Sequence, residues 1–269
     1  MTWTLGRTFE TPDGAIRWDS FGQGDPVVLL HGSPFSSYIW RDIAPALART
    51  RQVFVFDLLG YGRSEQRAGQ DVGLAAQGRR FAALLGHWGL SAPDVVAHDI
   101  GGAVALRALL LEGARYRHLT LVDAVGGGDW GTGFFKLIRE NASVFERLPG
   151  YAHEALVTSH LRYATHTGYR PGVLDAYLAP WRGPVGQAAF YRQYRDLEQA
   201  QSDAFEPLLG EVSVPTRIIW GREDRLLAGE FAERLHARIP GSELIWVDGA
   251  GHTVQEDAPA RLLALLTSP

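Results

Sequence analysis

An aspartate stands where a tight turn would present a nucleophile. The segment Ala97–Gly102 (AHDIGG) follows an apolar run and opens a helical pattern. A sharp turn between a strand and a helix exposes one side chain for attack on a substrate. Such a turn needs small neighbours, and Asp99 would occupy its exposed position. Alternatively, Asp99 only caps the helix that follows, since Asp is common at helix starts.

Two further residues could complete a set of nucleophile, acid and base. His252 lies on a glycine-rich turn after the last apolar run, and Asp224 follows the run before it. A carboxylate and an imidazole at neighbouring strand ends can meet, so that the carboxylate orients the base. Asp123, at the end of an earlier apolar run, is the alternative acid. We predict Asp224 as the acid, and we expect most of the other histidines at the surface.

Two backbone amides could stabilise negative charge beside Asp99. The segment His31–Pro34 (HGSP) ends an early apolar run and precedes the Asp99 turn in the chain. In a site of this kind, one N–H comes from such a loop and a second comes from the residue after the nucleophile. These would be the amides of Ser33 and Ile100.

Alternating strands and helices are expected to position these residues. Residues 3–21 indicate a hairpin that turns at 12–14. The apolar runs are of a length typical of strands buried on both faces. We predict strands at 26–30, 52–57, 94–98, 118–123, 216–220 and 243–247, and helices at 37–49, 74–88, 102–111, 228–238 and 259–267. This alternation predicts an α/β fold with a mostly parallel sheet between helices, and ligands then bind beyond the carboxyl ends of the strands.

The alternation stops in the middle of the chain. Residues 126–207 are rich in aromatic residues and in helical patterns, with no strand pattern. An insertion at the strand ends would cover a site located there. We therefore predict a core formed by residues 1–125 and 208–269, with residues 126–207 as a helical lid.

Composition excludes several kinds of site. The 269 residues carry a formal net charge of −4, which argues against nucleic acid as a partner. The absence of cysteine excludes disulfides, thiolate metal sites and a cysteine nucleophile. The start of the chain lacks a signal-peptide pattern and no apolar stretch is long enough to span a bilayer. We expect a cytoplasmic monomer or homodimer without a membrane, metal or cofactor requirement.

These motifs together resemble the α/β-hydrolase superfamily over nearly the whole chain. The resemblance rests on HDIGG, HGSPFSSYIW, DLLGYGRS and the late GAGH, in which nucleophile, acid and base also follow the family order. Asp99 stands where most members have Ser, as in the branch of haloalkane dehalogenases, fluoroacetate dehalogenases and epoxide hydrolases. A carboxylate can displace a leaving group from saturated carbon. His252, oriented by Asp224, would then activate water to hydrolyse the resulting alkyl ester on Asp99.

Three departures from the dehalogenase patterns bear on the leaving group. Haloalkane dehalogenases place a halide-binding Trp at the position of Ile100 and an Asn at the position of Ser33. Fluoroacetate dehalogenases carry Arg residues at the positions of Ile100 and Ala103. None of these side chains is present here.

The resemblance to epoxide hydrolases implies that lid tyrosines donate to the epoxide oxygen. The segment Phe190–Arg192 (FYR) resembles their late lid motif and makes Tyr191 our candidate donor, although simple packing would also explain it. Its partner could be Tyr163, Tyr169 or Tyr177. The segment Ala176–Trp181 resembles haloalkane dehalogenase lids, and there Trp181 could donate to a halide instead.

We predict a cofactor-independent epoxide hydrolase that acts on a small apolar electrophile and water. The alternatives are a dehalogenase with unusual halide donors, a specialised biosynthetic hydrolase with a substrate such as a lactone, and a ligand-binding protein without catalysis.

Overall fold

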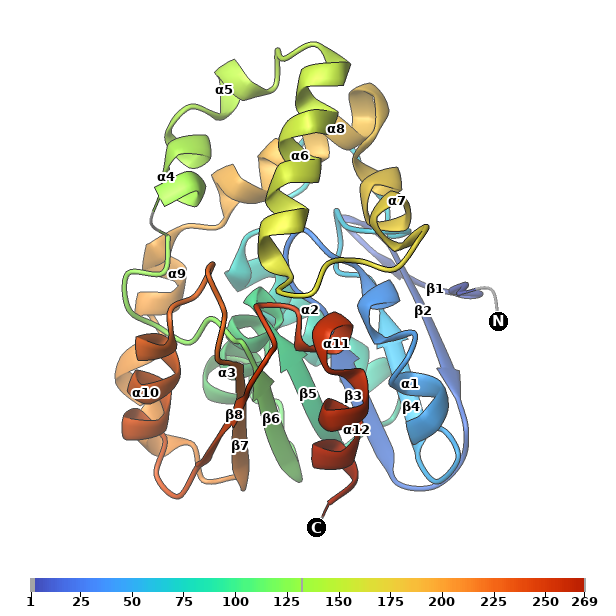
Figure 1. Ribbon diagram of the computed structural model, residues 1–269. Coiled ribbons are helices and arrows are strands. Elements are labelled where there is room, and N and C mark those ends of the chain that lie inside the picture. The colour runs from blue at the N-terminus through green and yellow to red at the C-terminus, as the bar shows by residue number, and fades with distance from the viewer. Residues whose placement is uncertain (1–2, 132, 269) are drawn as a thin grey trace.

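Eight strands form one sheet in the computed structural model, which describes residues 3–131 and 133–268 (Figure 1). The strand order is β1-β2-β4-β3-β5-β6-β7-β8, with β1 and β2 antiparallel to their neighbours and all other pairs parallel. The strands are β1 (Arg7–Thr11), β2 (Gly14–Phe21), β3 (Pro26–Leu30), β4 (Gln52–Phe56), β5 (Asp94–His98), β6 (His118–Val122), β7 (Thr216–Gly221) and β8 (Glu243–Val247). The predicted mostly parallel sheet is confirmed.

The central strands are buried because helices cover both faces of the sheet. In β3, β4 and β5 every residue after the first is buried, as the continuous apolar runs require. The helices α1 (Ala44–Leu47) and α12 (Pro259–Thr267) pack together in front of the sheet in Figure 1. Behind it lie α2 (Leu74–His87) and α3 (Ile100–Leu111), and α10 (Gly229–Arg238) packs on β7.

One predicted helix is wrong. Residues 37–49 form a short 3-10 helix, η1 (Ser37–Trp40), and then the single turn α1. Pro45 lies at the start of α1 and has no N–H to continue a helical ladder from η1. The buried carboxylate of Asp57 also accepts the Ser37 amide at 2.7 Å, which fixes η1 as a separate element.

A helical insertion connects β6 to β7. It comprises α4 (Gly133–Glu140), α5 (Ala142–Phe145), α6 (Gly150–Ala164), α7 (Val173–Leu178), η2 (Ala179–Trp181), α8 (Gly183–Asp196), α9 (Gln199–Asp203) and η3 (Glu206–Glu211). In Figure 1, α5, α6, α7 and α8 stand above the sheet, on the side where the parallel strands end. The insertion therefore faces the edge at which the polar residues of the sequence motifs meet.

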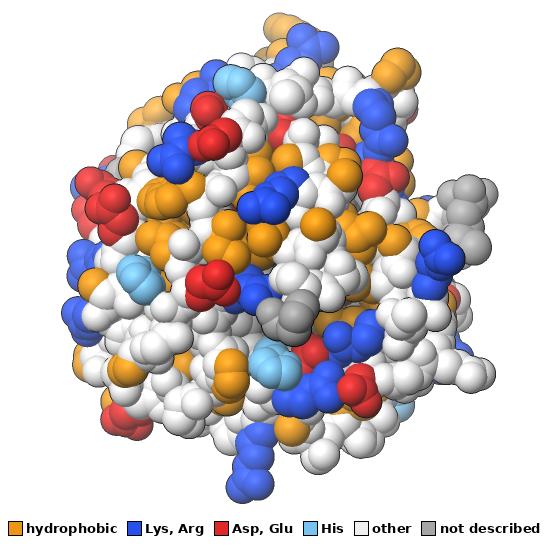
Figure 2. Space-filling model, turned by 60° about the horizontal axis from the view of Figure 1, so that its bottom comes forward, with side chains coloured by type: hydrophobic (Ala, Val, Ile, Leu, Met, Phe, Trp, Pro, Cys, Tyr) orange, Lys and Arg blue, Asp and Glu red, His pale blue; other side chains and the backbone are white. Residues whose placement is uncertain are grey.

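Charges of both signs are interspersed on the opposite end of the molecule. Figure 2 shows Arg, Asp and Glu side chains beside one another there, rather than one broad basic face. At the start of β5, the single carboxylate of Asp94 pairs with three partners, which are Arg51, Arg117 and His118. Among the described residues, no helix is both long enough and apolar enough to cross a membrane.

Candidate active site

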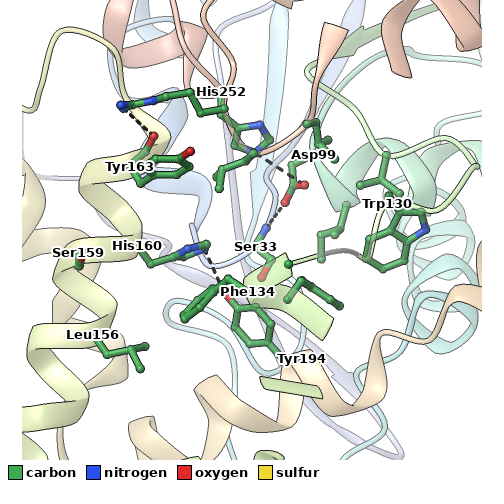
Figure 3. A pocket seen from close by; sticks show the side chains of 17 residues that line it. Ser33, Asp99, Trp130, Phe134, Leu156, Ser159, His160, Tyr163, Tyr194 and His252 are labelled. Atoms are coloured by element: carbon green, nitrogen blue, oxygen red, sulfur yellow. Dashed lines mark hydrogen bonds and ion pairs between the residues drawn. The ribbon is translucent and has the colours of Figure 1, made fainter. Parts of the chain in front are cut away.

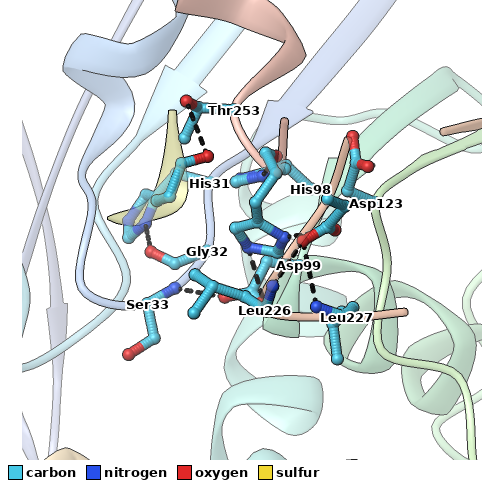
Figure 4. Close-up of polar contacts among 12 residues, drawn as sticks. His31, Gly32, Ser33, His98, Asp99, Asp123, Leu226, Leu227 and Thr253 are labelled. Atoms are coloured by element: carbon cyan, nitrogen blue, oxygen red, sulfur yellow. Dashed lines mark hydrogen bonds and ion pairs between the residues drawn. The ribbon is translucent and has the colours of Figure 1, made fainter. Parts of the chain in front are cut away.

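Asp99 lies at a tight turn between β5 and α3. Its backbone adopts φ 52° and ψ −126°, a conformation that is strained for a residue with a Cβ. Two glycines make the turn sterically accessible. A Cβ at Gly32 would lie 2.4 Å from the Asp99 Cβ, and one at Gly101 would lie 2.5 Å from the His31 carbonyl oxygen. The turn thus presents the Asp99 carboxylate away from the sheet (Figure 4).

Backbone amides hold the Asp99 carboxylate. Its Oδ2 accepts the Ser33 N–H at 2.7 Å, and the Ile100 amide also stabilises its charge. Burial raises the pKa of the Asp99 carboxyl, while the charge of His252 and the two amides offset part of this rise. Both predicted amides therefore converge on one side chain, and Oδ1 remains available on the other side.

His252 bridges the two carboxylates. Its Nδ1 donates to Asp224 Oδ2 at 2.9 Å, so Nε2 faces Asp99 Oδ1 across 3.7 Å. The other Asp224 oxygen accepts the amides of Leu226 and Leu227, at 2.7 and 3.0 Å (Figure 4). Burial lowers the pKa of His252, but the two carboxylates outweigh burial, so its pKa lies above the usual 6.5. The chain thus places a fixed, basic imidazole nitrogen beside Asp99.

A cavity of about 630 Å³ opens above Asp99 and His252. Its walls are largely apolar side chains from the insertion and the sheet edge, including Trp130, Phe134, Phe135, Leu156, Leu226 and Leu227. In Figure 3, His160 and Tyr194 lie on the wall of the cavity opposite Asp99. A small apolar molecule bound there would touch Asp99 on one side and these two polar groups on the other.

His160 and Tyr194 form a pair. The Tyr194 hydroxyl lies 3.1 Å from His160 Nε2, and the His160 ring stacks on Phe134 with ring centres 4.9 Å apart. Burial, and then the charge of His252, lowers the pKa of His160 to about 4. Burial raises the pKa of Tyr194 well above its usual 10. Both groups are therefore neutral near pH 7, and the pair can supply one hydrogen-bond donor to the cavity.

A family model described as the alpha/beta hydrolase fold matches residues 25–259. The chain belongs to this family.

Relatives of this hydrolase span different reactions. A crystal structure of an alpha/beta hydrolase fold protein from Burkholderia ambifaria superposes with a TM-score of 0.96 at 43% identity, covering 99% of this chain and 98% of that one. Haloalkane dehalogenase 2 of Mycobacterium tuberculosis is 27% identical over 97% of this chain and 93% of its own. The 2-hydroxy-6-oxo-2,4-heptadienoate hydrolase of Pseudomonas putida is 29% identical over 87% and 84%. The two named enzymes differ in substrate.

Asp123, the alternative acid, has a different environment in the hydrolase. Its Oδ1 accepts the Gly221 amide at 2.8 Å, and its buried Oδ2 has no hydrogen-bond partner among the described residues. Burial, and then the charge of Asp224, raises the pKa of Asp123 well above its usual value. Asp224 is thus the carboxylate that contacts His252, while Asp123 has the environment of a neutral acid.

Buried histidines support the site, contrary to the expectation that most lie at the surface. His98 Nε2 donates to the His252 carbonyl oxygen at 2.9 Å, and burial lowers the pKa of His98 well below its usual value. His31 Nε2 accepts the Leu58 amide at 2.9 Å. The exposed histidines are His87, His118, His166 and His236, whereas His31, His98 and His153 are buried and His160 is half-buried. A neutral imidazole can satisfy a backbone donor or acceptor in the interior, which composition alone does not reveal.

The two predicted substrate residues do not line the cavity. The Tyr191 hydroxyl contacts His153 Nδ1 at 2.9 Å, and the Trp181 indole donates to the Pro34 carbonyl at 2.8 Å. Tyr194, one helical turn beyond Tyr191, reaches the cavity instead. Of the three suggested partners only Tyr163 lines it, at the exposed rim.

The hydroxyl groups of Tyr169 and Tyr177 are bonded within the protein, outside the cavity. Tyr169 donates to the Leu161 carbonyl at 2.8 Å, and Tyr177 bonds to Glu256. Periodicity places several tyrosines on helices, but helix orientation decides which of them faces the ligand.

The loop of Ser33 is bonded to the insertion. The Ser33 hydroxyl donates to Gln193 Oε1 at 2.5 Å, and Trp181 reaches Pro34 in the same loop.

In the described parts of the chain, no group of three or more His, Asp or Glu side chains could hold a metal ion.

Proposed function

We propose that this hydrolase opens an epoxide to a diol through a covalent alkyl ester on Asp99. The observation that carries the proposal is the cavity itself. It places the Asp99 carboxylate opposite a neutral pair, His160 and Tyr194, with apolar walls between them. A carboxylate supplies the nucleophile, and the pair supplies the proton that an alkoxide leaving group needs.

In the first step, Asp99 Oδ1 attacks an epoxide carbon while Ser33 holds Oδ2. The carbon–oxygen bond of the ring breaks, and the oxygen takes the proton of the Tyr194 hydroxyl. The Nε2–H of neutral His160 donates to the Tyr194 oxygen and stabilises the phenolate formed. Tyr194 regains its proton from solvent after the product has left.

In the second step, His252 Nε2 takes a proton from water, which attacks the carbonyl carbon of the Asp99 ester. Asp224 stabilises the imidazolium through Nδ1. The amides of Ser33 and Ile100 stabilise the oxyanion that develops on Oδ2. The ester bond then breaks, and the departing diol oxygen takes the proton from His252. The Asp99 carboxyl group formed in this way releases its proton to solvent, which offsets the proton that Tyr194 takes up.

A halide leaving group is the second candidate, because haloalkane dehalogenase 2 of Mycobacterium tuberculosis is 27% identical over 97% of the chain. Halides are commonly held by indole N–H groups in that branch. Here the Trp130 indole donates to Ser202 Oγ and the Trp181 indole donates to Pro34, each at 2.8 Å. A hydroxyl that can transfer its proton suits an epoxide oxygen better than a halide.

The test uses His252→Gln, which should complete the first step and stall in the second. We would incubate it separately with 1,2-epoxyhexane and 1-bromohexane and record the intact mass. A gain equal to the whole epoxide, abolished by adding Asp99→Ala, supports the proposal. A gain equal to bromohexane minus HBr, without an epoxide adduct, assigns a dehalogenase.

The control is His236→Gln, the same change at an exposed histidine, which should turn over and retain no adduct. If neither reagent marks His252→Gln and a panel of lactones and esters also fails, the proposal is wrong and ligand binding becomes the better explanation.

A further inference from the structure

The C-terminal end of α6 is capped by the loops that carry Asp224 and His252. A helix leaves its last four carbonyl groups without intrahelical partners. At this end, Arg225 Nη2 donates to the carbonyls of Tyr163 and Thr165, each at 2.9 Å. The Thr253 amide donates to the Ala164 carbonyl at 3.2 Å. Arg225 directly follows Asp224 in the chain, and Thr253 directly follows His252.

Asp257 joins the same two regions from the other side. It accepts five hydrogen bonds, one from the Gly251 amide at 2.9 Å and four from the segment 165–167 at 2.6 to 2.9 Å. These four donors are the hydroxyls of Thr165 and Thr167 and the amides of His166 and Thr167. Gly251 directly precedes His252. One carboxylate therefore links the base loop to the segment that ends α6.

The approach between the base loop and α6 is close enough to exclude side chains. A Cβ at Gly251 would lie 3.0 Å from the Ala164 carbonyl oxygen and from the His166 amide. The donors around Asp257 lower its pKa despite burial, so the acceptor remains charged at neutral pH. Arg225 also places its cation at the negative end of α6 and over the Tyr163 ring, 4.4 Å from its centre.

We infer that Arg225, the Thr253 amide and Asp257 form a clamp that sets the position of His160, on α6, relative to Asp99 and His252. His160 lies one helical turn before the clamped end, so a shift of that end displaces its ring from the leaving-group oxygen. The inference rests on the proposed function and makes Asp257 a positioning residue. Asp257 is not among the residues that line the cavity, whereas Arg225 lines it.

The test measures the rate of adduct formation with 1,2-epoxyhexane in the His252→Gln background, which removes any effect through the base itself. Adding Asp257→Asn should slow adduct formation by about 10-fold or more, because ångström-scale misplacement of a reacting group is that costly. Thr167→Val deletes one of the five bonds and should slow it by about 2- to 3-fold. Asp248→Asn is the matched control, since that carboxylate is exposed and pairs with Arg222 far from His160 in the chain, and it should leave the rate unchanged.

A double-mutant cycle with His160→Phe separates positioning from general destabilisation. If the clamp acts through His160, Asp257→Asn should have at most about a 2-fold effect once His160 is replaced. An equal slowing with and without His160 would overturn the inference, as would an unchanged rate for Asp257→Asn in protein that melts cooperatively. Should Asp257→Asn fail to fold, Asp257→Glu, which keeps the charge but displaces the carboxylate, enters the same cycle with the same expectations. Failure of His252→Gln to form any adduct would instead overturn the proposed function.

Discussion

Asp99, His252 and Asp224 stand on loops at the ends of strands, whereas His160 and Tyr194 stand on helices of the insertion. On the sheet side, backbone amides, glycines without room for a Cβ and buried imidazoles fix each group. On the insertion side, aromatic stacking and the α6 clamp fix the groups. In the proposed reaction, the sheet side supplies the nucleophile and the base, while the insertion side selects the leaving group. Variants on the two sides should therefore differ in the step and in the size of their effects.

The largest effect is expected from Asp99→Ala. This change removes the proposed nucleophile and with it the proposed covalent route, so kcat/KM for an epoxide should fall by at least about 10⁴-fold. Diol formation measured by gas chromatography, with unfolding temperature as the control for folding, checks this. Activity within 10-fold of the parent would show that the sheet side does not supply the nucleophile.

Substitutions of the two candidate acids, Asp224 and Asp123, should have clearly different effects on the rate of ester hydrolysis. Asp224→Asn should slow ester hydrolysis by about 10³- to 10⁴-fold, because an amide cannot stabilise the imidazolium of His252. Asp123→Asn should remain within about 10-fold, since an amide resembles a neutral carboxylic acid in the same pocket. Single-turnover decay of the adduct compares them. The reverse order would make Asp123 the acid.

On the insertion side, a matched pair of tyrosines on α8 tests the assignment. Tyr194→Phe should slow adduct formation by about 10²-fold through loss of the proton donor. Tyr191→Phe loses only the bond to His153 and should stay within about 3-fold, given the usual net value of one neutral hydrogen bond. Equal losses would indicate packing rather than proton donation at both positions.

The smallest effect concerns pH. His252 must be neutral to act as a base, so ester hydrolysis should be lost as pH falls through its pKa. In the free protein, that pKa is raised partly by the charge of Asp99. The ester removes this charge, and the pKa should fall. The acid limb of adduct hydrolysis should therefore lie below the titration midpoint of His252 measured by NMR in the free protein. Coincident midpoints would show that Asp99 contributes nothing to the base.

The sheet side could be placed from the sequence because its residues follow strand ends. Asp99, Asp224 and His252 each come directly after a buried run or its turn, and parallel strands bring such ends to one edge. The choice of Asp224 over Asp123 was open, because both carboxyls end neighbouring strands. Only side-chain geometry shows which one reaches His252.

The insertion side could not be placed in the same way. Tyr191 and Tyr194 lie one turn apart on α8, and the tilt of the helix over the sheet decides which hydroxyl enters the cavity. The sequence leaves Trp181 open between a halide donor and a residue that packs the lid, and its indole N–H donates to the Pro34 carbonyl. The sequence gives no signal for His160, because a lone histidine in an aromatic helix does not stand out until the fold brings Tyr194 beside it.

The bonds from Ser33 to Gln193 and from Trp181 to Pro34 have a consequence for protein engineering and for the evolution of this chain. They make the amide that holds the nucleophile depend on two residues of the insertion. A graft that replaces the insertion with one from another family member would change the substrate range, but it would also release the Ser33 loop unless the donor supplies both partners. Substrate range and catalytic rate are therefore not independent modules in this molecule, and recombination should preserve function only where position 181, position 193 and the Ser33 loop are exchanged together.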